Sequence, residues 1–387
     1  MSLTDEKTQP TRLWDLAGGR RGIGIAVGVF ALTRVAQLII LAWLDAADDE
    51  PTGVRARLLV WDAGWFLRVA VDGYPHGYTF DAAGRMEGNE LAFFPLYPML
   101  TRVVAALGIP ASTAALIVSW LAAIGAAVAV HLLGTSLHDK RTGWALVGIC
   151  FGAPVAIVFS MAYTEGLFLA LVAGMLVAAH RRVWWAAGLL GLAAALTRPT
   201  GAAAAVALAV AALLAAREDR RKMWQPLGAA GLALLGVPLF LTWVGWRVGD
   251  PAAWFRIQAA GWGTAFDYGS STLSFLGTTF SSADGWVPIS VALILLAALA
   301  AAGVALAGKP WLPLAVYGLI AMALVYGQAG FYHSKPRLLV PVLLTLLPAA
   351  VAAGRARPRV AVLSIAAWAL FGLWYGAYLV TVWPYTL

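Results

Sequence analysis

The sequence predicts an all-α protein that crosses a membrane many times. Of its 387 residues, 61% are hydrophobic and 12% are charged, and the mean hydropathy is +0.79. A soluble domain contains about 25% charged residues, so this chain could not cover itself with a polar surface. Its apolar residues also gather into segments close to the roughly 20 residues that a membrane-spanning helix needs. These observations exclude a disordered chain and an ordinary soluble enzyme.

We expect eleven membrane-spanning helices, one in each long apolar segment. The predicted spans are residues 22–44, 112–135, 143–160, 163–180, 183–197, 200–216, 227–247, 287–307, 311–328, 336–353 and 359–380. One more apolar segment, 91–109, contains Pro95, Pro98 and Arg102, and we expect a re-entrant or interfacial helix there. If this segment spanned the membrane, the number of spans would be twelve.

The distribution of charge decides between eleven and twelve spans and orients the chain. With eleven spans and a cytoplasmic N-terminus, the connectors on the cytoplasmic side contain 16 Lys and Arg against 6 Asp and Glu. This is the asymmetry that the positive-inside rule describes. A twelfth span would move the charged cluster at residues 139–141 to the outer side. The net charge of +8 therefore indicates membrane orientation and no nucleic-acid partner.

The chain is predicted to form a single integral membrane domain over residues 1–387. Two outer connectors are long, 45–111 and 248–286, but neither is large enough for a typical independent domain. The first should contain amphipathic helices. We expect a multi-pass protein of the cell membrane whose site lies on the extracytoplasmic side, because the acids and bases described below fall in outer connectors.

Several kinds of chemistry lack the sequence patterns that they require. The chain has no G-x-x-x-x-G-K-[ST] loop, no H-E-x-x-H pair and no G-x-S-x-G turn. Its five histidines are dispersed, and its single cysteine, Cys150, excludes an intrachain disulfide and a Cys-based zinc site. We therefore expect neither a metal ion nor a cofactor.

The first outer connector contains a candidate helix with an acid at its start. Trp61, Trp65 and Val69 recur at helical spacing, which predicts a helix whose aromatic face lies at the membrane interface. Gly73 and the proline two residues later should end it. Asp62 then falls in the first turn, at the positive end of the helix dipole. Spacing alone leaves Asp62 as either a helix-start residue or a functional acid.

Two further acids are expected at outer turns. Glu90 precedes an aromatic, proline-rich segment, and its position alone fits a helix cap or a solvated acid as well as a functional group. Glu165 is surrounded by apolar residues, and an ionisable group near membrane depth is costly and often functional. Alternatively, Glu165 is a structural partner of a base such as Arg198, which lies at the next outer turn.

His333, Lys335 and Arg337 lie within five residues at a later outer turn. Alternation would place the three side chains on one side of an extended segment, and Pro336 disfavours a helical conformation for Lys335. Such a segment is a candidate anion clamp, because Lys and Arg form charge-assisted hydrogen bonds to phosphate. Alternatively, Lys335 and Arg337 extend toward lipid headgroups and bind no substrate.

Several motifs resemble those of the PIG-V mannosyltransferases. The run WDAGWFLRVAVDGY is followed by ELAFFPLYPML, YTEGLFLAL, TRPTG and KPRLLVPVLLTLLP, in the family's order, from about residue 61 to about residue 350. This family belongs to the GT-C class of polytopic glycosyltransferases, so the resemblance implies a GT-C-like fold. Arg outnumbers Lys by 22 to 5, which is typical of a bacterial member encoded by GC-rich DNA.

The resemblance implies an inverting transfer of mannose from a polyprenyl-phosphate donor to an acceptor hydroxyl on the extracytoplasmic side. It implies a catalytic Asp in the first outer connector, which corresponds to Asp62. We hypothesise that Asp62 is the general base, with Glu90 as its rival or as an acceptor-orienting group. The acceptor is not carried over, because bacteria generally lack GPI anchors. A glycan, a glycolipid and a protein remain open as acceptors.

The remaining candidates are assigned by charge and position. Lys335 and Arg337 are expected to hold the donor phosphate, with His333 and Arg198 as further candidates. Three residues are expected to orient the sugar or the acceptor: Glu165, Trp61 and Tyr332. If the bases neutralise the phosphate, the reaction needs no metal ion.

Two other classes of function remain possible. One is a transporter or flippase of a lipid-linked sugar, but such a site would be expected at the bilayer midplane, where only Arg34 and Gln37 are predicted to lie. The other is a non-catalytic membrane partner subunit. That function would leave the clustering of acids and bases in the outer connectors unexplained.

Overall fold

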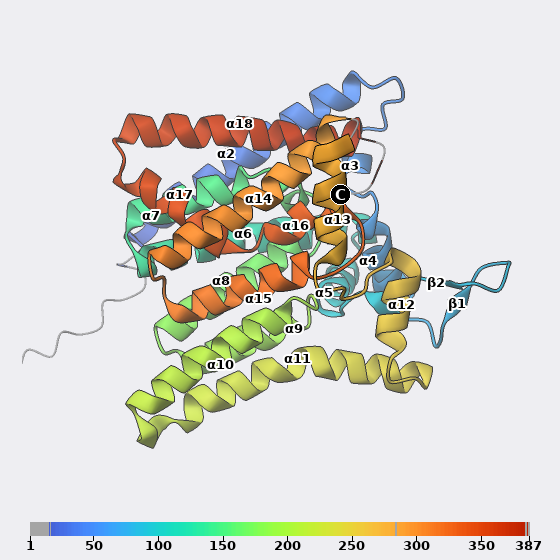
Figure 1. The fold of residues 1–387 in the computed structure, drawn as a ribbon, viewed down its shortest axis with the longest axis horizontal. Coiled ribbons are helices and arrows are strands. Elements are labelled where there is room, and N and C mark those ends of the chain that lie inside the picture. The colour runs from blue at the N-terminus through green and yellow to red at the C-terminus, as the bar shows by residue number, and fades with distance from the viewer. Residues whose placement is uncertain (1–14, 16, 283–284, 384, 386–387) are drawn as a thin grey trace, which may run out of the picture.

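The computed structural model describes residue 15 and residues 17–282, 285–383 and 385. Most of the segment predicted to precede the first span in the cytoplasm, residues 1–14 and 16, lies outside the described residues. Most of the described chain is helical (Figure 1). Its two short strands, β1 (Thr79–Phe80) and β2 (Met86–Glu87), pair antiparallel in a hairpin of the first outer connector.

Among the described residues, six helices are long and apolar enough to cross a membrane. They are α2 (Gly19–Ala46), α6 (Ala111–Leu137), α10 (Gly201–Glu218), α11 (Trp224–Val248), α14 (Trp286–Ala307) and α18 (Pro358–Thr381). Their 18 to 28 residues correspond to about 27 Å or more at 1.5 Å per residue, which matches the hydrocarbon core of a bilayer. Each coincides with one predicted span. The architecture is that of a polytopic all-α membrane protein.

The other predicted spans are shorter or broken helices. They are α7 (Lys140–Phe151), α8 (Glu165–His180), α9 (Trp184–Ala195), α15 (Leu312–Tyr326), and the pair α16 (Lys335–Leu339) and α17 (Leu343–Arg355). The segment that ends with α16 is bent by 56° relative to α17. The single span predicted over 336–353 is therefore wrong in this respect. Pro341 lies in the break and cannot donate the backbone hydrogen bond of a continuous helix.

The predicted span 143–160 is also wrong as one continuous helix. The helix α7 ends at Phe151, and after an irregular turn a 3-10 helix, η2 (Ala156–Phe159), follows. The freed carbonyl groups find a partner in Arg34, which is fully buried in the middle of α2. The guanidinium of Arg34 donates to the backbone oxygens of Phe151 and, at 2.7 Å, of Ala156. Irregular backbone at membrane depth is tolerated only when protein groups satisfy it in this way.

The connector over residues 45–111, predicted to lie on the outer side, forms four helical segments: α3 (Val54–Arg57), α4 (Asp62–Val71), the 3-10 helix η1 (Glu90–Ala92) and α5 (Leu96–Ala105). The predicted helix with Asp62 in its first turn is confirmed as α4, which ends just before Gly73. At ten residues, α5 is too short to cross a bilayer, in agreement with a re-entrant or interfacial helix at 91–109.

The described part of the second long connector, residues 248–282 and 285–286, contains the helices α12 (Ala253–Trp262) and α13 (Ser270–Ser282). In Figure 1 the connectors around η3 (Arg220–Lys222), between α14 and α15, and between α17 and α18 lie at the left end of the bundle. The helices α4, α5, α12 and α13 lie toward the opposite end. We call this opposite end the cavity end, because both long connectors meet there and enclose the site described next.

Candidate active site

A cavity of about 460 Å³ lies at the cavity end of the bundle. Its walls come from α4, η1, the N-terminus of α8, the turn between α9 and α10, α12, the loop after α15, and α16. These segments are far apart in the sequence, and five of them come from the four connectors that were predicted to be outer ones with acids or bases. The polar side chains in its wall include Asp62, Thr164, Glu165, Arg198, Gln258, Lys335 and Arg337.

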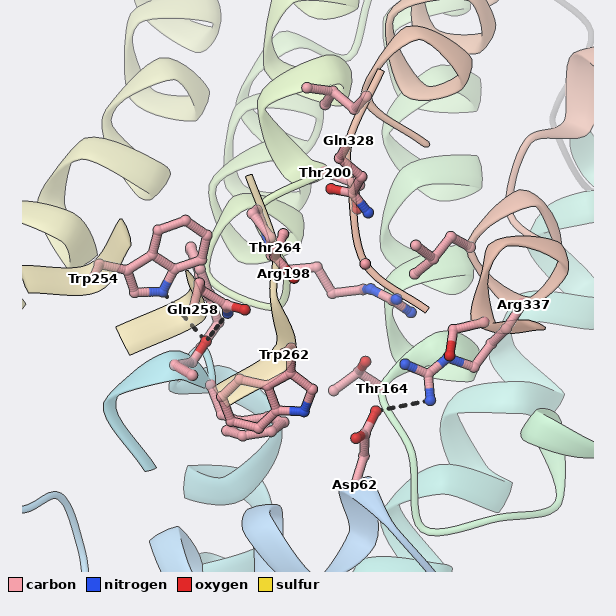
Figure 2. Close-up of a pocket in the computed structure, with 18 of the residues that line it drawn as sticks. Asp62, Thr164, Arg198, Thr200, Trp254, Gln258, Trp262, Thr264, Gln328 and Arg337 are labelled. Carbon is pink, nitrogen blue, oxygen red and sulfur yellow. Dashed lines mark hydrogen bonds and ion pairs between the residues drawn. The ribbon is translucent and has the colours of Figure 1, made fainter. Parts of the chain in front are cut away.

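Four of the predicted site residues form one chain of alternating charge. The guanidinium of Arg337 contacts Asp62 Oδ2 through one terminal nitrogen at 2.7 Å, and its Nε lies 3.4 Å from Glu165 Oε1. Glu165 Oε1 is also 2.7 Å from a terminal nitrogen of Arg198. The order is therefore Asp62, Arg337, Glu165, Arg198. Figure 2 shows the Asp62–Arg337 pair and the side chain of Arg198 extending toward it.

The two acids of this chain differ in burial. The Asp62 side chain is 21% exposed, whereas that of Glu165 is 2% exposed and lies between two arginines. Each acid is the first residue of its helix, α4 and α8 respectively, where the helix dipole stabilises negative charge. A ligand in the cavity can therefore reach Asp62 directly, while Glu165 is enclosed by its partners.

Lys335 lines the cavity, but its ammonium group is already hydrogen bonded to the protein. It donates to Thr272 Oγ1 at 2.8 Å and to the backbone oxygens of Val325 and Gln328 at 2.9 and 2.7 Å. These contacts use all three donors of an ammonium group. Lys335 thus ties α13 to the end of α15 in this conformation.

The predicted extended segment through His333, Lys335 and Arg337 is wrong. Residues 332–334 form a 3-10 turn, η4, and Lys335 is the first residue of α16. Pro336 is compatible with this helix because it falls in the first turn, where its missing N–H leaves no hydrogen bond unmade. Lys335 and Arg337 of this helix line the cavity, whereas His333 does not.

Four further predicted residues lie outside the cavity lining. Glu90 pairs with Arg68 Nε at 2.7 Å in η1, and Arg68 lies over the ring of Trp65. Trp61 precedes α4 and packs against the main core. Tyr332 stacks on Phe275 with ring centroids 4.4 Å apart, and the ring of His333 packs beside that of Tyr332. These four residues thus lie apart from Asp62 and Arg337, which contact each other.

The helix α12 also lines the cavity, although no residue of it was among the predicted site residues. Trp254, Gln258 and Trp262 line the cavity from this helix, and the first two both donate to the backbone oxygen of Ala92 in η1, at 3.2 and 3.1 Å (Figure 2). The signal was present, because buried Ala253, Trp254 and Ile257 recur at helical spacing inside a long outer connector. Sequence alone does not indicate that this helix faces Asp62.

The remaining lining groups include no metal-binding cluster. Across residues 17–282 and 285–383, no three His, Cys, Asp or Glu side chains gather in a way that would hold a metal ion. In the cavity wall, the space between the two carboxylates is bridged by Arg337. The positive charge that faces a ligand there belongs to the protein itself.

The fold and the cavity define a polytopic helical membrane protein with a charged site at one end of its bundle. No family model matches the chain. Over 139 residues, 33% of the chain, it is 36% identical to GPI mannosyltransferase 2 of Drosophila pseudoobscura pseudoobscura. Over 172 residues, 42% of the chain, it is 31% identical to GPI alpha-1,6-mannosyltransferase 2 of Mus musculus.

These similarities support the resemblance to the PIG-V mannosyltransferases. The matching regions cover 27% of the fly protein and 33% of the mouse protein, so the chain matches a third or less of the length of these curated relatives.

Proposed function

We propose that this protein is a membrane mannosyltransferase that moves a mannosyl residue from a polyprenyl-phosphate donor to an acceptor hydroxyl, with inversion at the anomeric carbon. The observation that supports it most directly is the Asp62–Arg337 pair in the cavity wall, at 2.7 Å. A transferase of this kind needs one group to take a proton and another to hold a phosphate, and the pair offers both. The similarity to two mannosyltransferases supports the mannosyl transfer itself.

In the proposed reaction, Asp62 is the general base. Its carboxylate takes the proton from the acceptor hydroxyl while the hydroxyl oxygen attacks the anomeric carbon. The bond from that carbon to the phosphate oxygen breaks, and its electron pair leaves with the lipid phosphate. The transition state is oxocarbenium-like, as in glycoside hydrolysis. Attack opposite the leaving group inverts the configuration, so a β-linked donor gives an α-mannoside.

Arg337 and Arg198 are the proposed phosphate ligands. Both line the cavity, and their planar guanidinium groups suit bidentate binding of phosphate. The donor phosphate would then be a third anion for Arg337, because without substrate this side chain already contacts Asp62 and Glu165. Donor phosphate would compete for Arg337 and so weaken its hold on Asp62, which makes that carboxylate a better base. Lys335 has the smaller role of holding the cavity wall in place, since its three donors are occupied.

A second cavity supports a donor with a lipid tail. It has a volume of about 800 Å³ and is lined almost entirely by apolar side chains of α14, α17 and α18, together with Pro336, Leu339 and Val340. Lys335, Arg337 and Leu338 of the same short segment line the charged cavity. The helix α16 therefore separates a place for phosphate and sugar from a place for an isoprenoid chain.

The proposal is tested with purified protein in nanodiscs, polyprenyl-phosphate mannose labelled in the sugar, and a panel of glycan, glycolipid and peptide acceptors. We expect labelled product and one free lipid phosphate for each mannose transferred. A flippase would instead move intact donor across sealed vesicles without releasing phosphate. A partner subunit would neither transfer mannose nor move the donor. Flipping of intact donor without phosphate release, or the absence of both activities, would refute the proposed transferase.

A further inference from the structure

Tyr163 contacts both the Arg337 side chain and the turn that carries Asp62. The guanidinium carbon of Arg337 lies 5.1 Å from the centre of the Tyr163 ring, within the range of a cation–π contact. The phenol hydroxyl donates to the backbone oxygen of Val60 at 3.4 Å, and the backbone N–H of Asp62 hydrogen bonds to the same hydroxyl. Tyr163 is 1% exposed and does not line the cavity. It therefore meets the charged pair from the protein side, where no ligand reaches it.

The turn before α4 has a backbone conformation that an aromatic residue rarely adopts. Trp61 has a φ of 56° and a ψ of −113°, and the Val60 oxygen accepts a 3.4 Å hydrogen bond from the Ala63 N–H. These are the angles of the first central position of a type II′ turn, where glycine is preferred because it lacks a Cβ. Such a conformation persists only where surrounding contacts hold it. The hydroxyl of Tyr163 is one of these contacts, and the packing of Trp61 against the main core is another.

Tyr163 is itself fixed through its backbone. The hydroxyl oxygen of Ser119 in α6 accepts from the Tyr163 N–H at 3.2 Å and donates to the Tyr163 oxygen at 3.1 Å. The hydroxyl of Tyr97 lies 2.8 Å from the same Ser119 oxygen. All three residues are buried, at 2% exposed or less. Because this support is buried and closely packed, the Tyr163 ring limits where Arg337 and the Asp62 turn can lie.

We propose that Tyr163 is a positioning residue that holds the Asp62–Arg337 pair in its working geometry. Its hydroxyl fixes the turn that presents Asp62, and its ring supports the guanidinium of Arg337. This inference rests on the proposed transferase function, in which Asp62 takes a proton and Arg337 holds phosphate. The hydroxyl of Tyr163 therefore serves the chemical step and its ring serves donor binding, while Tyr163 itself takes part in no bond that forms or breaks.

The kinetic test compares Tyr163→Phe and Tyr163→Leu with the unaltered protein in nanodiscs, with polyprenyl-phosphate mannose as donor and the acceptor of the panel that gives most product. Tyr163→Phe keeps the ring, so it should lower kcat by about tenfold and leave the donor KM unchanged, because small displacements of a catalytic group are costly. Tyr163→Leu also removes the aromatic support of Arg337 and should raise the donor KM by about fivefold in addition.

Tyr375→Phe is the matched control. Tyr375 is 0% exposed, its hydroxyl lies 3.0 Å from Ser290 Oγ, and it lines neither cavity. The control loses the same chemical group from an equally buried site, so it should keep the kcat and the donor KM of the unaltered protein. Equal losses of kcat in Tyr163→Phe and Tyr375→Phe would overturn the inference.

A double-mutant cycle shows whether the hydroxyl acts through Asp62. The Asp62→Asn variant has already lost the base, so adding Tyr163→Phe should lower its residual rate very little. Independent effects would instead multiply. A full further loss of rate in the double variant would overturn the positioning role.

A stability cycle tests the same support without any transfer. Trp61→Gly adopts the turn without strain, so Tyr163→Phe should lower the melting temperature less in the Trp61→Gly protein than in the unaltered protein. An equal fall in both would overturn the inference. If no variant and no unaltered protein transferred mannose, but this coupling were present, the proposed function would fail and the support of the Asp62 turn by Tyr163 would stand.

Discussion

Arg337 contacts both acids of the cavity, and its position distinguishes the two. Asp62 meets one terminal nitrogen of Arg337 and is partly exposed to the cavity. Glu165 is almost completely buried and contacts Arg337 and Arg198 with the same oxygen atom. At the scale of single residues, we therefore propose Asp62 as the acid that takes part in the chemistry and Glu165 as the acid that holds two guanidinium groups.

Substitution of Asp62 should mainly lower the rate of transfer, whereas substitution of Glu165 should mainly lower the stability of the fold. Asp62→Asn should lower the transfer rate by about 10²–10⁴-fold, the range in which a general base contributes, with a small change in melting temperature. Glu165→Gln leaves two arginines in a buried site without their shared anion and should cost about 3–5 kcal/mol of unfolding free energy. Both are measured on protein in nanodiscs. Near wild-type transfer by Asp62→Asn would remove Asp62 as the base.

Lys335 should act on stability more than on the donor. Lys335→Met leaves the backbone oxygens of Val325 and Gln328 without their charged donor, and each lost partner costs roughly 1–3 kcal/mol. We expect a clear fall in melting temperature and a smaller effect on donor KM. Arg337→Ala, as the matched comparison, should raise donor KM more strongly. If the Lys335→Met protein were stable but no longer bound donor, Lys335 would have to be assigned as a ligand of the donor phosphate.

At the scale of elements, the break after α7 depends on one side chain of another helix. Arg34 is buried in α2, and besides the two carbonyl oxygens it contacts Ser160 Oγ at 3.2 Å. The helix α18 also packs closely against the break, because a Cβ on Gly372 would lie 2.1 Å from the Gly152 oxygen. The broken helix is therefore a packed structure, built where three helices meet.

Arg34→Met should destabilise the protein more than an exposed substitution in the same helix. It leaves the carbonyl groups of Phe151 and Ala156 unpaired in a buried site, at roughly 1–3 kcal/mol each. Leu32→Ala is the control, because Leu32 is 71% exposed. Thermal unfolding in nanodiscs measures both. Equal melting temperatures for the two variants would show that Arg34 is not needed to stabilise the break.

At the scale of the whole molecule, the two ends of the bundle differ in the length of their connectors and in their charge. The cavity end holds both long connectors and the chain of alternating charge, whereas the opposite end has short connectors such as the one at η3, with its three basic residues. We propose that the cavity end faces the extracytoplasmic side, since the basic connectors follow the positive-inside rule.

Cysteine labelling tests this orientation. The native cysteine, Cys150, is fully buried, so introduced cysteines report on their own positions. Ala83→Cys in the hairpin and Arg221→Cys in η3 are both exposed sites, one at each end. In intact cells, an impermeant maleimide should label position 83 and should label position 221 only after permeabilisation. The reverse pattern would invert the topology and place the cavity in the cytoplasm.

The sequence predicted the helical elements better than it predicted their continuity. Apolar length is a local property, so the six long helices were predictable to within a few residues. Breaks depend on distant partners. The one after α7 requires Arg34, which lies more than a hundred positions earlier, and the helix at Lys335 depends on Pro336 falling within a first turn. Neighbouring residues do not specify such contacts.

The candidate site was predictable in its charged members. Asp62, Glu165, Arg198 and Arg337 were singled out because ionisable groups are rare and costly in so apolar a chain, and the structure joins all four. Glu90 and His333 satisfied the same rule but lie outside the cavity lining. Trp262 was missed because an aromatic residue in an apolar chain carries no comparable signal.

By itself the sequence determined that the chain is helical, membrane-embedded and basic toward one side, because length, hydropathy and charge act locally and additively. Only the tertiary structure decided which charges are neighbours, which lysine is already satisfied and which helix faces Asp62. Those properties depend on packing between segments up to a few hundred residues apart. Close packing allows a side chain such as Arg337 or Trp262 one position among many that its own sequence neighbourhood would permit.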